Sequence, residues 1–232
     1  MKLLTEGNQK IEKGRKLGFM TYGVHLAPSD LAGYNTCQFA SAGCRMACLN
    51  TAGRGRMTAI QESRIKKTKY FFEKKQEFLE QLKKEVNLAV GRAERKGLQP
   101  CFRLNLTSDI PWENVRLKSS GLSIFDSFPQ VQFYDYTKSF KRALNYLQGR
   151  LPSNYQITFS RSESNQSFAD MILKAGGNVA VVFRDKLPAE YNGKQVIDGD
   201  ETDLRFLDPS NCVVGLTEKG LAKQDESGFV VG

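Results

Sequence analysis

The chain has 232 residues, 40% of them hydrophobic and 25% charged, which is typical of a globular protein with a substantial core. Its N-terminal stretch MKLLTEGNQKIEKGRK lacks the continuous apolar run of about 7–15 residues that a signal peptide needs. No apolar run approaches the roughly 20 residues of a membrane span, so we expect a cytoplasmic protein without a membrane partner. In that reducing compartment, clustered cysteines more often bind metal or do chemistry than form disulfides.

The formal net charge of +9 is unevenly distributed along the chain. Residues 1–100 contain 19 Lys and Arg against 9 Asp and Glu, whereas residues 101–232 contain 15 against 16. This asymmetry favours an anionic partner, such as nucleic acid, an acidic host protein or a charged small molecule. The alternative is a helix whose lysines simply face solvent. The basic side chains concerned are Arg64, Lys66, Lys67, Lys69, Lys74 and Lys75.

In chain order, the segment KLGFMTYGVHLAP predicts a first strand that ends near His25 and is stopped by Pro28. From Thr58 to Lys96, apolar residues recur at spacings of three and four, which predicts helix. The length favours two helices with a bend near residues 73–76, and Gly97 ends the second. The apolar face comprises Ile60, Ile65, Phe71, Phe72, Phe78, Leu82, Val86 and Val90.

The second half of the chain has a different pattern of apolar residues. Short apolar runs recur, and helical patterns fit between several of them, for example at residues 139–148 and 165–175. The runs are CFRLNL, VQFYDY, YQITFS, NVAVVF, KQVIDG and CVVGL. We expect a single α/β domain over residues 1–232, folded as an incomplete (β/α) barrel of about six or seven mostly parallel strands. An open doubly wound sheet is the alternative.

In both architectures, ligands bind where the parallel strands end, at an edge that we call the mouth. Polar side chains follow several of the predicted strands, and we expect them to converge there on a small molecule or cofactor. The alternative is that they are ordinary loop residues and helix N-caps. The candidates are Asn105, Ser108, Asp109, Asp135, Tyr136, Lys138, Ser160, Arg161 and Glu163.

Three cysteines lie close together in CQFASAGCRMACLNTAGRG, with the spacing C-x6-C-x3-C at Cys37, Cys44 and Cys48. Cys44 and Cys48 are four residues apart and would share one face of a helix. Three thiolates can hold a 4Fe–4S cluster whose fourth iron takes another ligand. Zinc, which prefers four ligands, is the second interpretation, and disulfides or inert thiols are the third. The domain would then comprise a cluster-binding loop, a long basic helical segment and the main β/α part, at residues 30–57, 58–97 and 98–232.

Other residues complete the predicted site. His25, the only histidine, is the candidate for the fourth metal ligand, and its alternative role is that of a hydrogen-bonded polar residue. Cys101 and Cys212 stand at the starts of strands, away from the mouth, and are expected in the core. The glycine-rich segment NTAGRGR begins at Asn50. Its glycines let backbone N–H groups approach an anion, and Arg54 and Arg56 add charge, so it would cradle a carboxylate or phosphate of a cofactor. A plain turn is the alternative.

The cysteine stretch, together with SGLSIFDSFP, FYDYTK, NYQITFSRSESN, RLNLTSDIPWE and VIDGDETDLRFLDP, resembles the bacteriophage proteins called the gene-product-eighty-eight family. The resemblance extends from about Leu17 to the C-terminus. It implies a phage origin, and hence the cytoplasm of the host, and a cluster-type cysteine motif at Cys37, Cys44 and Cys48.

A looser resemblance is to radical S-adenosylmethionine enzymes, which join a partial (β/α) barrel to a 4Fe–4S site with the motif C-x3-C-x2-C. Cys44 and Cys48 match its first two positions, Thr51 stands at the third, and Cys37 would replace it. LNLTSDIPWE stands where a glycine-rich methionine-binding signature is expected. This resemblance implies S-adenosylmethionine as a further cofactor and a redox or radical role on an unknown substrate. The alternative is a phage protein that binds nucleic acid or a host protein and uses zinc structurally.

Overall fold

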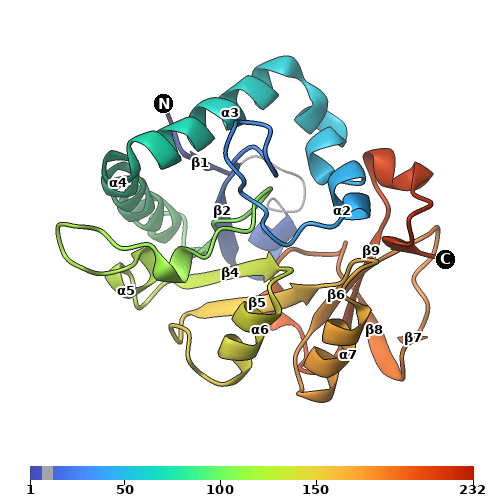
Figure 1. Ribbon diagram of the computed structural model, residues 1–232. Coiled ribbons are helices and arrows are strands. Elements are labelled where there is room, and N and C mark those ends of the chain that lie inside the picture. The colour runs from blue at the N-terminus through green and yellow to red at the C-terminus, as the bar shows by residue number, and fades with distance from the viewer. Residues whose placement is uncertain (7–12) are drawn as a thin grey trace.

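The computed structural model describes residues 1–6 and 13–232 (Figure 1). Residues 7–12, part of the polar N-terminal stretch that argues against a signal peptide, lie outside the described residues. The described part contains a ten-stranded sheet in the order β1-β2-β3-β4-β5-β6-β9-β8-β7, with β10 beside β6. The strands are β1 (Leu4–Thr5), β2 (Phe19–Val24), β3 (Gln99–Arg103), β4 (Gln132–Thr137), β5 (Tyr155–Ser160), β6 (Val179–Phe183), β7 (Glu190–Tyr191), β8 (Lys194–Asp198), β9 (Val213–Thr217) and β10 (Val230–Val231).

Most neighbouring strands run parallel. All pairings from β2 across the sheet to β8 are parallel, as is the pairing of β10 with β6, whereas β1 and β7 pair antiparallel at the two edges. Among the described residues, no pairing joins one edge of the sheet to the other, so the sheet is not closed. The expected α/β class with a mostly parallel sheet is confirmed. The open sheet is compatible with the doubly wound alternative, and the incomplete barrel stays a prediction.

Helices connect these strands and pack along the sheet (Figure 1). The α-helices are α2 (Ala42–Met46), α3 (Thr58–Glu73), α4 (Lys75–Glu94), α5 (Ile124–Ser127), α6 (Phe140–Leu147) and α7 (Gln166–Lys174). Short 3-10 helices are η1 (Gly14–Leu17), η2 (Leu49–Thr51), η3 (Gly53–Arg56), η4 (Trp112–Asn114), η5 (Arg205–Leu207) and η6 (Gly220–Gln224).

The predicted pair of helices between residues 58 and 96 is confirmed. Lys74, with φ −131° and ψ 48°, breaks the helix between α3 and α4, within the predicted bend. Gly97 follows with φ +65°, a conformation that favours glycine and ends the helical run. Leu82 and Val86 are fully buried, as the apolar spacing predicted, but Ile60 is 38% exposed. The prediction for Ile60 was wrong, because the first turn of α3 projects beyond the core.

Different elements pack against the two faces of the sheet. Phe133 on β4 belongs to the main core, which also contains residues of α4, α6 and α7. Its neighbour Tyr134 points to the other face and packs with Cys101 and Leu204, just before η5. Cys101 and Cys212 are both buried, as predicted for strand starts. Helices therefore cover one face and the η5 segment the other, which leaves the carboxyl ends of the strands for a site.

Candidate metal centre

The cysteine loop (residues 30–57) lies between β2 and α3, and its three cysteines are free and half-buried. Cys44 lies in α2, where the Ser41 hydroxyl caps the helix by accepting the Cys44 N–H at 3.2 Å. Cys48 lies beyond that helix and caps η2, its Sγ accepting the Asn50 N–H at 3.5 Å. The expectation that Cys44 and Cys48 share a helix face was wrong, because α2 ends at Met46 and the chain then turns into η2.

The three thiols lie within electrostatic range of one another. Burial raises the pKa of Cys37, and the Cys44 thiolate would raise it further. Burial also raises the pKa of Cys48 to about 11, with smaller contributions from Cys44 and Cys37. Thiolates that surround one cation repel each other, and their attraction to the cation must exceed this repulsion. Burial therefore favours the protonated forms of Cys37 and Cys48, and a metal that bound them would displace their protons.

His25 follows β2 and shares a neighbour with Cys37. The Thr107 hydroxyl donates to the Leu26 carbonyl at 2.6 Å and lies 3.4 Å from His25 Nδ1. Because that hydroxyl proton is already used, we assign the imidazole proton to Nδ1, which leaves Nε2 without a proton. Cys37 Sγ lies 3.9 Å from the Thr107 carbonyl oxygen. Burial lowers the pKa of His25 to about 3, so the ring is neutral, the form that ligates metal.

Glu163, from the mouth, anchors the cysteine loop. Its carboxylate accepts the Gly43 N–H at 2.8 Å and the Ser41 hydroxyl at 2.7 Å. A side chain at Gly43 would collide with Ser227 Oγ and approach Phe229 Cβ to 2.8 Å, so only glycine permits this docking. Glu163, which was expected at the mouth, therefore holds the cysteine loop there.

Replacing Glu163 with alanine should loosen the loop. Two hydrogen bonds to a charged acceptor are lost, so we expect a loss of about 1–3 kcal/mol in the free energy of unfolding. Hydrogen exchange at the Gly43 amide should accelerate, whereas exchange in α7 should stay unchanged. Glu163→Gln, which keeps one acceptor oxygen, should give an intermediate rate. Unchanged exchange at Gly43 in Glu163→Ala would show that the carboxylate does not hold the loop.

The segment after Cys48 is fixed by α3. Asn50 is buried, and its side-chain amide donates to Gln61 Oε1 at 2.7 Å. The Arg64 guanidinium donates to Asn50 Oδ1 from the other side. Arg54, predicted to bind an anion beside Asn50, is exposed on η3. The Asn50 side chain therefore fixes the turn, and anion binding by this segment stays a prediction.

The side chains of Asn105 and Ser108 also form hydrogen bonds within the protein. Asn105 is 2% exposed, and its Oδ1 accepts hydrogen bonds from the Ser108 hydroxyl, the Ile110 N–H and the Trp112 indole N–H. Its Nδ2 donates to the Ile110 carbonyl at 3.0 Å. These contacts satisfy the amide, so the prediction that Asn105 lines the mouth was wrong. It fixes the loop after β3 instead.

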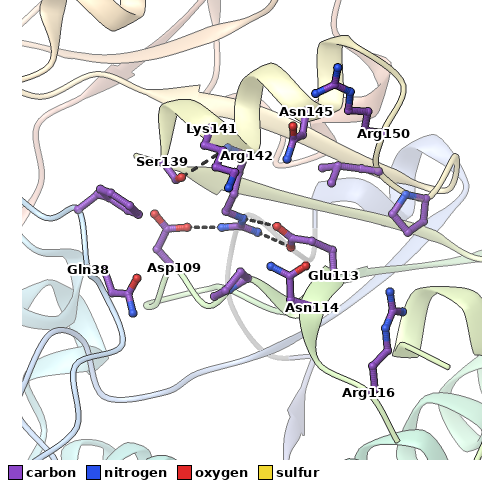
Figure 2. Close-up of a pocket in the computed structure, with 14 residues that line it drawn as sticks. Gln38, Asp109, Glu113, Asn114, Arg116, Ser139, Lys141, Arg142, Asn145 and Arg150 are labelled. Carbon is purple, nitrogen blue, oxygen red and sulfur yellow. Dashed lines mark hydrogen bonds and ion pairs between the residues drawn. The ribbon is translucent and has the colours of Figure 1, made fainter. Parts of the chain in front are cut away.

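Asp109 lies at a cavity of about 300 Å³ beside the cysteine loop (Figure 2). Arg142 of α6 points between Asp109 and Glu113, donating to Glu113 at 2.7 and 3.0 Å and also to Asp109. Gln38, next to Cys37, lies on the same side of the cavity as Asp109, and Arg150 lies on the far side (Figure 2). The sequence motifs did not indicate Glu113 or Arg142.

The remaining candidate residues lie either at the mouth or on the sheet face that η5 covers. Lys138 Nζ donates to Ser160 Oγ at 2.7 Å, so two neighbouring strand ends meet there. Arg161 binds the C-terminal segment through the Phe229 carbonyl at 3.0 Å. Tyr136 packs against the buried residues Ala180, Cys212 and Val214. The Arg103 guanidinium lies 4.5 Å from the centre of the Tyr136 ring. Tyr136 on β4 points to the face under η5, one residue before the strand ends, and its role at the mouth stays a prediction.

Asp135 on β4 is a buried carboxylic acid. Its carboxylate accepts the Asn105 N–H at 2.8 Å and the Tyr155 hydroxyl at 3.1 Å. Burial raises its pKa to about 7, against the opposing effects of Arg103 and of the hydrogen bond from Asn105. In the unfolded chain the pKa returns to about 3.9. The folded protein therefore holds this proton over a range of pH in which the unfolded chain has lost it.

The stabilising effect of that proton should be complete below about pH 4 and should disappear as the pH rises through about 7. Between these limits, the free energy of unfolding of the wild type relative to Asp135→Asn should fall by about 2–4 kcal/mol. Urea denaturation across this range measures the difference. Parallel pH curves for the wild type and Asp135→Asn would contradict the prediction.

Within residues 1–6 and 13–232, no group of three or more His, Cys, Asp or Glu side chains is arranged to hold a metal ion. In the same residues, no helix is both long and apolar enough to cross a membrane.

Fold and site thus define a mixed α/β protein with an open, mostly parallel sheet and a three-cysteine loop docked at its carboxyl edge. The family model described as gene product 88 matches residues 2–232, so the chain belongs to this bacteriophage family. No curated protein and no solved structure matches the chain. The looser resemblance to radical S-adenosylmethionine enzymes has no support from these comparisons.

Proposed function

We propose that this phage protein binds an iron–sulfur cluster through Cys37, Cys44 and Cys48, with His25 as the candidate fourth ligand. The observation that carries the proposal is the presence of three free, half-buried thiols on one loop. Thiolates are soft ligands that select iron–sulfur clusters or zinc, and three of them with one nitrogen suit a 4Fe–4S cluster. The neutral imidazole of His25 adds the nitrogen.

A bound cluster would supply one-electron transfer or a Lewis-acidic iron. The chain's own residues would position it. Glu163 holds the start of α2, and Thr107 orients the His25 ring while it contacts Cys37. The cavity beside Gln38 would admit a small molecule next to the loop. We place this activity in the reducing cytoplasm of the host, on a sheet curved as an incomplete barrel.

The test is the metal content of protein purified without oxygen. About four iron atoms per chain with matching acid-labile sulfide would support the proposal. Absorption and EPR spectra before and after dithionite would show whether the cluster accepts an electron. Titration with S-adenosylmethionine would then test for an open iron. Zinc without sulfide would overturn the proposal.

The second candidate is a phage protein that binds nucleic acid or a host protein and uses zinc structurally. The exposed basic side chains of the first half, including Arg54, Lys66 and Lys69, favour it. Arg64 and Lys67 were expected in the same basic surface but are buried, which weakens that surface. Binding through phosphates should weaken steeply with salt. A gel-shift assay with duplex and single-stranded nucleic acid at two salt concentrations separates this candidate from the first.

A further inference from the structure

The cavity beside Arg142 has a charged floor whose groups bind one another (Figure 2). The Arg142 guanidinium lies between the carboxylates of Asp109 and Glu113, and the exposed fraction of each of these side chains is 11% or less. Asp109 lies on the same side of the cavity as Gln38 (Figure 2). Its carboxylate disfavours an anion at that end.

Positive charge gathers on the side of the cavity away from Asp109. Arg150 and Arg116 both lie there (Figure 2), and Lys141 of α6 also lines the cavity. Arg116 pairs with Asp126, but both side chains are partly exposed. Arg150 and Lys141 are exposed and pair with no carboxylate in residues 1–6 and 13–232. These two cations are therefore free to bind an anionic group of a ligand.

Two amide side chains lie near these cations. Asn114 of η4 and Asn145 of α6 line the cavity on the Glu113 side of Arg142 (Figure 2). In the described part of the chain, neither side chain forms a hydrogen bond. The Arg150 N–H donates to the Asn145 carbonyl oxygen at 2.9 Å, which holds these two residues together. A primary amide both donates and accepts, so it suits the hydroxyl groups or ring nitrogens of a ligand.

An aromatic ring lines the cavity next to Gln38. Phe39 of the cysteine loop is 53% exposed there. An exposed aromatic face offers a stacking surface for a planar ring. Since Asp109 disfavours an anion on this side, a neutral ring suits it better than a charged group.

The charge and size of the cavity indicate the class of ligand. Its lining has four cationic side chains against two carboxylates, a net charge of +2. A phosphate monoester carries about −1.5 to −2 at pH 7, which matches this charge more closely than a single carboxylate does. The cavity volume of about 300 Å³ lies at the lower end of the range for small-molecule sites.

We propose that this cavity binds a small phosphate monoester with a planar ring, such as a nucleoside monophosphate. The phosphate lies against Arg150 and Lys141, and the ring stacks on Phe39. The inference adds a ligand class to the cavity of the proposed function, but it holds whether or not the cysteine loop binds a cluster.

Calorimetric titration of the purified full chain with AMP tests the inference. We expect AMP to bind more tightly than adenosine or inorganic phosphate, because each of these lacks one of the two groups that the cavity holds. Binding should weaken as the salt concentration rises. If AMP does not bind at millimolar concentration, or binds no more tightly than its fragments, the inference is overturned. Tighter binding of phthalate, which carries two carboxylates on a ring, would show that the ligand class is wrong.

Two variants locate the binding. Arg150→Gln should weaken AMP binding about tenfold, because a charge-assisted hydrogen bond is lost, and should leave the urea midpoint unchanged. Phe39→Ala should also weaken AMP binding about tenfold, but should leave the affinity for inorganic phosphate unchanged. Arg95→Gln, at an exposed arginine that does not line the cavity, is the matched control and should change neither affinity. Equal AMP affinity in the wild type and both cavity variants would place the binding elsewhere and overturn the inference.

Further measurements separate the inference from the proposed function. The iron and sulfide contents of the same sample test the cluster. AMP binding without iron would support the inference and contradict the cluster, and a cluster without AMP binding would do the reverse. A short single-stranded DNA that binds about tenfold more tightly than AMP would overturn the small-molecule assignment and favour the nucleic-acid candidate.

Discussion

If the cysteine loop binds the proposed iron–sulfur cluster, replacing Cys44 with serine should abolish the absorption of that cluster. Cys44 would be one of three soft ligands, and its loss leaves two thiolates and one imidazole. Since even residues that only support a metal ligand change metal affinity by about 10–100-fold, we expect the loss of a ligand to exceed that range. Iron and sulfide per chain should fall to the background of the assay. The fold should persist, because Cys44 is half-buried and serine is similar in size.

Cys212→Ser is the matched control for this substitution. Cys212 is 2% exposed and its Sγ lies 3.2 Å from the Pro209 carbonyl oxygen, a hydrogen bond that a serine hydroxyl can also make. It lies at the start of β9, away from the mouth. We expect Cys212→Ser to keep its iron and sulfide. A normal cluster in Cys44→Ser would exclude Cys44 as a ligand. Loss of the cluster only in Cys212→Ser would show that Cys212, and not Cys44, is needed to hold it.

Replacing Arg142 with methionine should destabilise the protein by about 3–5 kcal/mol, because two buried carboxylates then lose their counter-charge. Arg142 is 7% exposed, and its guanidinium contacts both Asp109 and Glu113 (Figure 2). It also donates to the Tyr155 hydroxyl at 2.9 Å, which in turn donates to Asp135. Urea denaturation near neutral pH measures the change.

A surface ion pair provides the comparison for Arg142. Arg92 lies 2.7 Å from Glu6, but its side chain is 42% exposed, so Arg92→Met should cost about 0–1 kcal/mol. Adding Glu113→Gln to Arg142→Met should recover part of the lost stability, because it removes one uncompensated charge. If Arg142→Met costs no more than Arg92→Met, the network does not stabilise the fold.

The sequence predicted the elements whose residues repeat regularly. The spacing of apolar residues indicated α3 and α4, and the apolar runs indicated the strands from β2 to β9 except β7. It missed β1, β7 and β10, which have only two residues each and so carry no periodic pattern. β10 pairs with β6, which is distant in the chain, whereas β7 pairs with the directly following β8.

The candidate site was harder to predict, because its contacts join residues far apart in the sequence. The spacing C-x6-C-x3-C identified the cysteine loop, and the strand ends indicated Glu163. Neither pattern could indicate that Glu163 binds Gly43, which lies 120 residues earlier. Asn105 and Tyr136 were placed at the mouth because polar residues follow strands. Their actual contacts depend on which face each strand turns to the core, and on loop partners that a single sequence does not reveal.

The packing of the cysteine loop also has a consequence for the order of events during synthesis. Ala47 of this loop packs against Ala222, Phe229 and Val230, in a segment that lies beside α2 (Figure 1). The ribosome makes the cysteines about 180 residues before these partners, which at ~10 residues per second is roughly 20 seconds. Throughout that interval the thiols belong to a nascent chain that lacks the C-terminal surface against which Ala47 packs. The loop can therefore reach its final packing only after the last strand has been translated.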